Sequence, residues 1–308
     1  MKPGVKKWFM DAGKWTYKRD GGCVIWDTRF DRDLRKTETV QYGVDRYQLF
    51  DTSLYIKDSL PGLAHTSLVN SEVMSQAGFM TPPPIILSKK ECSQKRIKIA
   101  TQDVSSLDGL ECVSAAKLYG WALFETPAIK SGDKWSVLRD KKVRDFFLQY
   151  MTPECLEQLV NAFIATELLA DADMNLGNYL LIKKPESKLY EGICPIDLEQ
   201  SEILFMDQDN RGRGDIEKLL HKPYTSITPT NSKDKLSYTQ RMQEIRKLVE
   251  DGLLTKSNKD TIRAVLSCNV PQIAKNVNKA YKKIKNKRAV DISAKIMHCA
   301  ESILEPVL

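Results

Sequence analysis

The chain has 308 residues, a formal net charge of +7 and 42% hydrophobic residues. This length and content are enough for a large core, arranged as one large domain or as two lobes. No stretch approaches the roughly 20 apolar residues of a membrane-spanning helix, and the basic first residues lack the apolar segment of a secretory signal. The seven cysteines are scattered singly, which excludes zinc-type spacing and favours free thiols in a reducing compartment such as the cytoplasm.

The first hundred residues have the pattern of a sheet of about five strands with one inserted helix. The expected strands lie at residues 23–26, 40–42, 47–50, 53–59, 85–87 and 95–100. The strand that begins at Ser53 carries Lys57 near its end. Residues 66–77 fit one apolar helical face with Glu72 at its middle, and Gly78 is a natural C-terminal cap.

After residue 100 the patterns become mainly helical. Residues 110–124 fit a helix, and Thr152 and Pro153 form an N-cap and first-turn pair that opens a strongly apolar one. Residues 208–235 have the composition of a loop. From Tyr238 to the end the chain is predicted to be helical, with breaks near residues 251–252 and 271.

Two four-residue apolar runs, at 179–182 and 193–196, flank a segment rich in turn formers at 183–192. This is the pattern of an antiparallel hairpin. If Ile182 lies opposite Ile193, the hairpin places polar residues from both strands at its open end.

In that register Asn178 falls beside Asp197, so an amide oxygen and a carboxylate converge at one end of a small sheet. Oxygen ligands from few side chains suit Mg²⁺ on a nucleotide, because waters and phosphates complete its coordination. Asp173, five residues before the amide, is placed to orient an attacking hydroxyl. Together these three residues outline a phosphoryl-transfer site.

Two other interpretations of this segment exist. Asp and Asn gather wherever a helix turns into a strand, because both tolerate turn geometry. Asp171, Asp173 and Asn175 also have the spacing of the first ligands of an EF-hand. That interpretation fails, because the positions that need Gly and a bidentate Glu hold Leu176 and Ile182.

The order of these features resembles the protein kinase superfamily, in particular its remote branch of HipA-like and phosphatidylinositol-kinase-like bacterial enzymes. The resemblance covers roughly residues 45–205, with residues 53–82 similar to the strand-lysine and helix-glutamate segment and residues 99–104 similar to the hinge. It implies an α+β, two-lobed fold. The sheet-rich N-lobe would span residues 1–100 and the mostly helical C-lobe residues 101–308.

The resemblance also implies roles in nucleotide binding. Lys57 would pair with Glu72 and hold the α- and β-phosphates of ATP, a task suited to a compact cation on a long stem. Gln102 and Asp103 would belong to the hinge that contacts the nucleotide.

Asp173 would accept or orient the proton of the substrate hydroxyl, and Asn178 and Asp197 would hold Mg²⁺ or Mn²⁺. The implied activity is transfer of the γ-phosphate of ATP to a protein hydroxyl. A bacterial effector that reaches a host cytosol by a non-Sec route would suit the resemblance.

The sequence departs from the kinase pattern at several points. It has no Gly-x-Gly-x-x-Gly loop, Leu198 and Glu199 follow Asp197 in place of Phe-Gly, and no activation segment is recognisable after Glu202. A phosphoinositide or small-molecule kinase therefore stays open as an alternative. So do a pseudokinase that only binds its ligands and an enzyme that transfers a nucleotidyl group from a flipped ATP.

Residues 241–308 hold 14 Lys and Arg against 7 Asp and Glu, which accounts for the whole net charge. Within them, residues 272–289 fit one amphipathic helix with no acidic residue. Its polar face would carry four lysines: Lys275, Lys279, Lys282 and Lys283. A lysine-rich face can simply keep a helix soluble. It can also bind a polyanion, such as an inositol polyphosphate or an anionic lipid headgroup, that orders the active site. Nucleic acid is the weakest candidate, because no reading motif is present.

Overall fold

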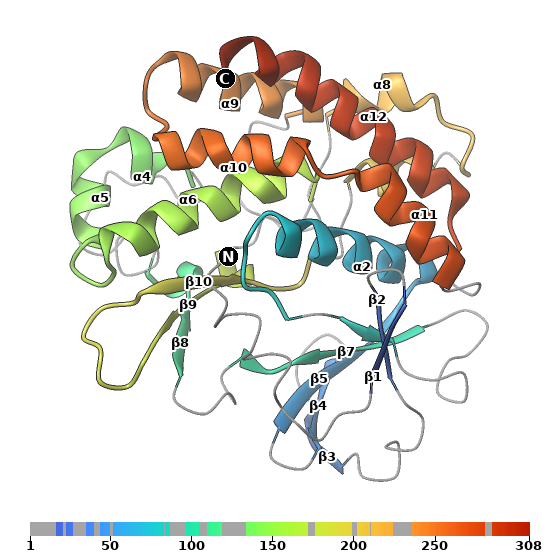
Figure 1. The fold of residues 1–308 in the computed structure, drawn as a ribbon, viewed down its shortest axis with the longest axis horizontal. Helices are drawn as coiled ribbons and strands as arrows, with labels where there is room; N and C mark the ends of the chain where they lie inside the picture. The colour runs from blue at the N-terminus through green and yellow to red at the C-terminus, as the bar shows by residue number, and fades with distance from the viewer. Residues whose placement is uncertain are drawn as a thin grey trace.

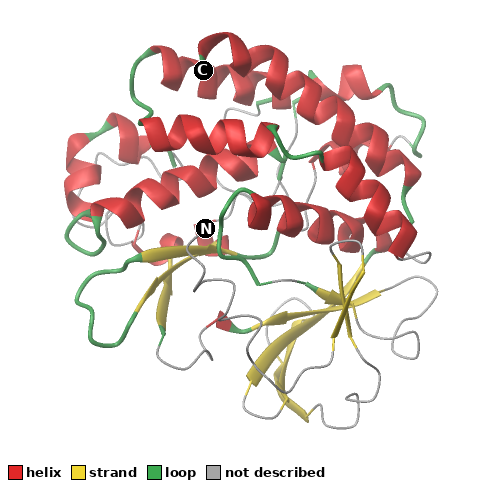
Figure 2. Cartoon of the chain, viewed as in Figure 1, coloured by secondary structure: helices red, strands yellow, loops and turns green. Residues whose placement is uncertain are grey.

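The structure is a computed structural model of the chain. It describes residues 17–20, 23–26, 35–39, 44–49, 52–82, 84–86, 97–104, 110–118, 134–171, 176–198, 202–209, 211–223, 236–280 and 285–308. Strands gather on one side of the molecule and helices on the other (Figures 1 and 2). The predicted α+β class is therefore confirmed.

The larger sheet has seven strands in the order β1-β2-β6-β7-β5-β4-β3. Its strands are β1 (Tyr17–Asp20), β2 (Cys23–Trp26), β3 (Arg35–Thr39), β4 (Val44–Leu49), β5 (Thr52–Ser59), β6 (Ile85–Ile86) and β7 (Ile97–Gln102). All neighbours are antiparallel except β2 and β6. The sheet is larger than the predicted five strands, and the expected strand at 40–42 lies outside the described residues.

Strand β5 lies inside this sheet, between β4 and β7, and Lys57 stands opposite Val44 on one side and Ile99 on the other. Two hydrogen-bonded neighbours fix the position of this strand more firmly than an edge position would. The backbone of Lys57 is therefore held on both sides.

Helix α2 (Pro61–Gln76) follows β5 almost directly. It starts earlier than the predicted residue 66, because Pro61 occupies the first helical turn, where its missing N–H costs nothing. At its other end Gly78 has a φ of +95°, which confirms the predicted glycine cap. The helix packs against α10 and α11 and also touches β7, so it joins the larger sheet to the C-terminal helices (Figure 1).

The second sheet has three antiparallel strands in the order β10-β9-β8. They are β8 (Glu111–Ser114), β9 (Tyr179–Lys183) and β10 (Gly192–Pro195). The helix predicted from residue 110 is wrong at its start, because Cys112 pairs with Ile182 of β9 and a strand forms there. Residues 115–118 are helical, as predicted, and residues 119–124 of the predicted helix lie outside the described residues.

The helical layer contains α4 (Ser136–Arg139), α5 (Lys141–Phe147), α6 (Pro153–Leu168), α7 (Glu202–Asp209), α8 (Ile216–Leu220), α9 (Tyr238–Glu250), α10 (Lys256–Leu266), α11 (Val270–Ala280) and α12 (Lys287–Leu304). Short 3-10 helices lie at Leu176–Asn178 and Glu305–Val307. Helices α7 and α8 overlap or fall within residues 208–235, which were expected to be loop. Among the described residues, no helix is both long enough and apolar enough to cross a bilayer.

Helix α6 packs mainly against α10 and β10, and the chain that leaves it leads to the predicted site. Thr152 caps it by accepting a hydrogen bond from the Cys155 N–H at 3.1 Å, and Pro153 occupies the first turn, as predicted. Every residue from position 159 to 168 is buried. The predicted lobes, and their boundary after residue 100, stay predictions.

Candidate functional site

The predicted hairpin is present, as β9 and β10, but its register differs by one residue. Ile182 stands opposite Gly192 in place of Ile193, and Tyr179 stands opposite Pro195. A one-residue shift changes every cross-strand partner. The start of β10 is set from outside the hairpin, because Tyr190 bridges to Met151 just before the return strand begins.

The open end of the hairpin still brings together the two predicted metal-binding residues. Beyond the last strand pair, the Ile196 N–H donates to the carbonyl oxygen of Asn178 at 2.8 Å. Asp197 is the next residue and has a φ of +58°, in the left-handed region that few non-glycine residues adopt. Asn178 and Asp197 therefore lie at the same end of the small sheet, one residue out of the predicted alignment.

Lys57 reaches this end of the hairpin from the larger sheet. Its ammonium Nζ forms an ion pair with Asp197 Oδ1. The two side chains are 18% and 36% exposed, so the pair lies at a partly open surface. A cation and a carboxylate that are 140 positions apart in the chain are thus in direct contact.

Glu72, the predicted partner of Lys57, lies on α2. Its Oε1 accepts a hydrogen bond from Gln76 Nε2 at 3.0 Å, one turn further along the helix. Burial and the nearby Glu72 carboxylate raise the pKa of the Cys268 thiol, so the end of α10 is close to this carboxylate. The pairing of Lys57 with Glu72 stays a prediction.

The predicted hinge residues continue from strand β7. Gln102 ends the strand and is buried, and the Asp103 N–H donates to the Ser53 carbonyl at 2.9 Å. The buried Asp103 carboxylate is 2.7 Å from Arg46 of β4. Asp103 is thereby held against its own sheet, and its role in nucleotide binding stays a prediction.

A small apolar cluster lies between the end of β7 and the hairpin. Its buried members are Met80, Val104, Ile182 and Cys194. Leu180, Ile196 and Cys112 pack against it. This cluster was not predicted from the sequence. The alternation of side chains along β9 could have indicated it, because Leu180 and Ile182 face away from Tyr179 and Leu181, which belong to the main core.

Asp173, the predicted catalytic carboxylate, lies outside the described residues, in the segment 172–175. The residues on both sides are firmly held. The Asp171 N–H donates to the Thr166 carbonyl at 3.1 Å. On the other side, the Tyr179 hydroxyl is 2.6 Å from the Thr166 hydroxyl. The role of Asp173 stays a prediction.

The basic C-terminal segment is two helices in place of the predicted one. Helix α11 ends at Ala280, residues 285–286 are not helical, and Asn286 caps the start of α12 by accepting from the Ala289 N–H at 3.0 Å. Lys275 and Lys279 are exposed on α11, as expected, with Ile273 and Val277 buried beneath them. Lys282 and Lys283 lie outside the described residues. Binding of a polyanion here stays a prediction.

The donors at the hairpin end fit a nucleotide-bound divalent metal. Within the part of the chain that the structure describes, no three His, Cys, Asp or Glu residues gather as a metal cage. Mg²⁺ on ATP does not require one, because phosphates and waters provide most of its ligands. A carboxylate from Asp197 and an amide from Asn178 are suitable oxygen donors, with a lysine alongside for the phosphates.

Comparison with solved structures defines the class of fold. The fold is related to that of kinases: the chain matches the Helicobacter pylori proinflammatory kinase CtkA with a TM-score of 0.53 at 15% sequence identity. This match covers 88% of the present chain and 94% of CtkA. The Shewanella oneidensis toxin HipA, solved with HipB and operator DNA, matches with a TM-score of 0.40 at 11% identity, over 89% of this chain and 63% of HipA. No family model and no curated protein sequence matches the chain.

Proposed function

We propose that this protein is a kinase that transfers the γ-phosphate of ATP to a hydroxyl group of a protein substrate. The observation that carries the proposal is the contact between Lys57 and Asp197 at the end of the hairpin that also holds Asn178. The match to a kinase fold over 88% of the chain supports it. At this point the Lys57 ammonium contacts the Asp197 carboxylate and Asn178 lies at the same end of the hairpin, a set of groups that ATP with its metal would use.

The small apolar cluster supplies the surface on which the adenine base would pack. It is formed from both sides of the site: Met80 and Val104 come from the segments that follow α2 and β7, and Ile182 and Cys194 come from the hairpin. Flat aromatic ligands gain much of their affinity from such apolar contact. Ile182 and Cys194 of the cluster belong to the same hairpin that leads to Asp197, so this hairpin would contact both the base and the phosphates.

In the proposed reaction Lys57 holds the α- and β-phosphates and Asp197 and Asn178 hold the metal. When bound, Mg²⁺ or Mn²⁺ would supply positive charge that stabilises the phosphate oxygens during transfer, with ADP as the leaving group. Asp173 orients the substrate hydroxyl for in-line attack and accepts its proton. Lys57 forms an ion pair with the Asp197 carboxylate, so binding of metal and nucleotide would exchange this pair for contacts with the phosphates.

Transfer of label from γ-labelled ATP tests the proposal, with the protein itself and casein as acceptors. We expect Lys57→Met and Asp197→Asn each to slow transfer about 100-fold or more, because each removes a group that stabilises charge in the transition state. Lys183→Met is a matched control. Lys183 is also a strand lysine paired with a carboxylate, 3.0 Å from Glu111, and it is 17% exposed, close to the value for Lys57.

The control variant should transfer label at close to the wild-type rate, because partly exposed ion pairs contribute little to folding. Transfer that persists in Asp197→Asn, or that falls equally in Lys183→Met, contradicts the proposed site. Label that enters phosphoinositide vesicles and no protein would replace the protein substrate with a lipid one.

A further inference from the structure

Asp197 has a left-handed backbone conformation, which is unfavourable for most residues other than glycine. Its φ of +58° lies in the left-handed region, which costs free energy for residues other than glycine, although Asp tolerates it better than most. Such conformations persist where the surrounding structure over-determines them, and they cluster at functional sites. The contacts on either side of Asp197 therefore show what holds it.

Each neighbour of Asp197 makes a backbone hydrogen bond to a different part of the molecule. Before it, the Ile196 N–H donates to the Asn178 carbonyl at 2.8 Å. After it, the Leu198 carbonyl accepts a hydrogen bond from the side-chain amide of Asn70 at 3.2 Å. The first bond extends the hairpin ladder. The second comes from a side chain 128 positions away in the chain.

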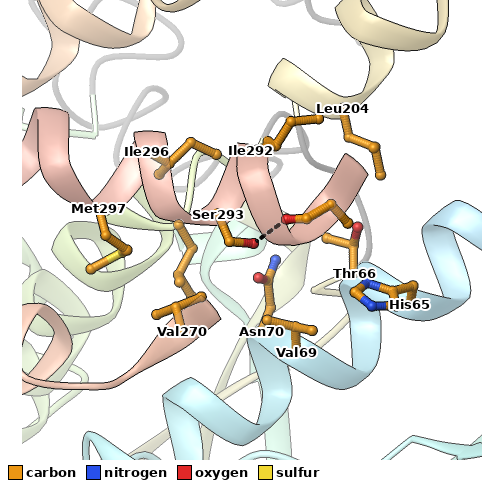
Figure 3. A pocket seen from close by; sticks show the side chains of 12 residues that line it. His65, Thr66, Val69, Asn70, Leu204, Val270, Ile292, Ser293, Ile296 and Met297 are labelled. Carbon is orange, nitrogen blue, oxygen red and sulfur yellow. Dashed lines mark hydrogen bonds between the residues drawn. The ribbon is translucent and has the colours of Figure 1, made fainter. Parts of the chain in front are cut away.

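Asn70 lies in the middle of α2 and is 4% exposed, while Leu198 is 3% exposed. A buried amide inside a helix is unfavourable unless its hydrogen bonds are made. Asn70 lines a pocket between α2 and α12 together with His65 and Ser293, and its side chain points from α2 toward Ser293 (Figure 3). Both partners of the hydrogen bond between Asn70 and Leu198 are therefore buried in the fold.

Helix α2 also begins two residues after β5, the strand that carries Lys57. The helix that donates to Leu198 is thus covalently close to the lysine that contacts Asp197. Asn70 and Lys57 restrain the same short segment from two directions, one through the backbone and one through the carboxylate.

We propose that Asn70 is a positioning residue that fixes the Asp197 carboxylate where a nucleotide-bound divalent metal would meet it. The inference rests on the proposed function, because it assumes that Asp197 is a metal ligand. Residues that orient metal ligands through hydrogen bonds commonly change metal affinity about 10- to 100-fold when they are removed. Asn70 would act in this way without touching the metal.

The test compares nucleotide binding with and without metal in the full chain. Affinity for a fluorescent ATP analogue is measured in Mn²⁺ and in EDTA for the wild type, Asn70→Ala and Asn70→Leu. We expect the ratio of affinity in Mn²⁺ to affinity in EDTA to be about 10-fold smaller in both variants than in the wild type. Affinity in EDTA should stay at the wild-type value. Asn70→Leu fills the space that Asn70→Ala empties, so agreement between them assigns the effect to the lost amide.

Asn161→Ala is the matched control. Asn161 is another buried helix asparagine, in α6, whose amide binds Ser257 at 3.2 Å and Asn258 at 2.6 Å away from the site. Its loss should lower the melting temperature and leave the Mn²⁺ dependence unchanged. An unchanged Mn²⁺ dependence in both Asn70 variants, or an equal loss in Asn161→Ala, overturns the inference alone. Absence of nucleotide binding by the folded wild type overturns the proposed function and this inference together.

Discussion

The His65 side chain connects helix α2 to helix α11 by a hydrogen bond. It lies on α2, is 1% exposed, and its Nε2 donates to the Ala274 carbonyl of α11 at 3.3 Å. Burial lowers the pKa of this imidazole from 6.5 to about 4, although the hydrogen bond to Ala274 opposes the change. The neutral ring is therefore the form that the folded protein keeps at neutral pH.

This burial predicts a specific loss of stability in acid. In the unfolded chain His65 binds a proton as the pH falls below 6.5, whereas in the folded chain it does so only near pH 4. The free energy of unfolding should therefore fall by up to about 3 kcal/mol as the pH decreases through this window. Denaturant unfolding at a series of pH values should show a smaller decrease for His65→Gln than for the wild type. The exposed His298 provides the control: His298→Gln should keep the wild-type slope, and equal slopes for all three proteins would contradict the prediction.

At the scale of elements, a buried charge cluster joins α6 and α9 just before the site. Glu167 of α6 is 2.5 Å from Lys134 and 3.2 Å from Arg241 of α9, and all three residues are buried. Burial alone would raise the pKa of Glu167, but the two cations outweigh it and keep that pKa below its ordinary value. The carboxylate is therefore charged in the folded protein and compensates two buried cations.

Removal of this carboxylate should destabilise the protein strongly. Glu167→Gln leaves Lys134 and Arg241 buried without their counter-charge, and we expect it to lower the free energy of unfolding by about 3 kcal/mol. Glu250→Gln, which breaks the exposed pair with Arg246 on α9, should change it by less than about 0.5 kcal/mol. Chemical denaturation of both variants measures the difference. Similar changes in the free energy of unfolding for the two variants would contradict the prediction that the buried charge cluster contributes more to stability than the exposed pair.

At the scale of the whole molecule, the sequence predicted the parts of the site that are local. Two short apolar runs predicted the strands of the hairpin, and the turn-rich segment between them predicted its closure. The order of Lys57 and Asp197 along the chain predicted that they belong to one site, and the ion pair between them agrees. These features depend on periodicity and order, which a single sequence contains.

The features that were missed depend on contacts between distant segments. The segment Glu111–Ser114 was predicted to be helical from its local pattern. It forms strand β8 because it pairs with β9, which is distant in the sequence. The hairpin register was wrong by one residue, because the bridge from Tyr190 to Met151 lies outside the hairpin. The role of Asn70 was not predicted, because the local sequence around a helical asparagine does not indicate that it binds the Leu198 carbonyl, 128 positions away.

The proposed reaction is transfer of the γ-phosphate of ATP at the site formed by Lys57, Asn178 and Asp197. The most direct measurement incubates the wild-type protein and casein with Mg²⁺ and either γ-labelled or α-labelled ATP, and follows the label on protein. We expect label on protein from γ-labelled ATP alone, and loss of this label in Asp197→Asn. Label from α-labelled ATP would instead identify a nucleotidyl transferase. No label from either nucleotide, with nucleotide binding intact, would identify a pseudokinase and contradict the proposed kinase activity.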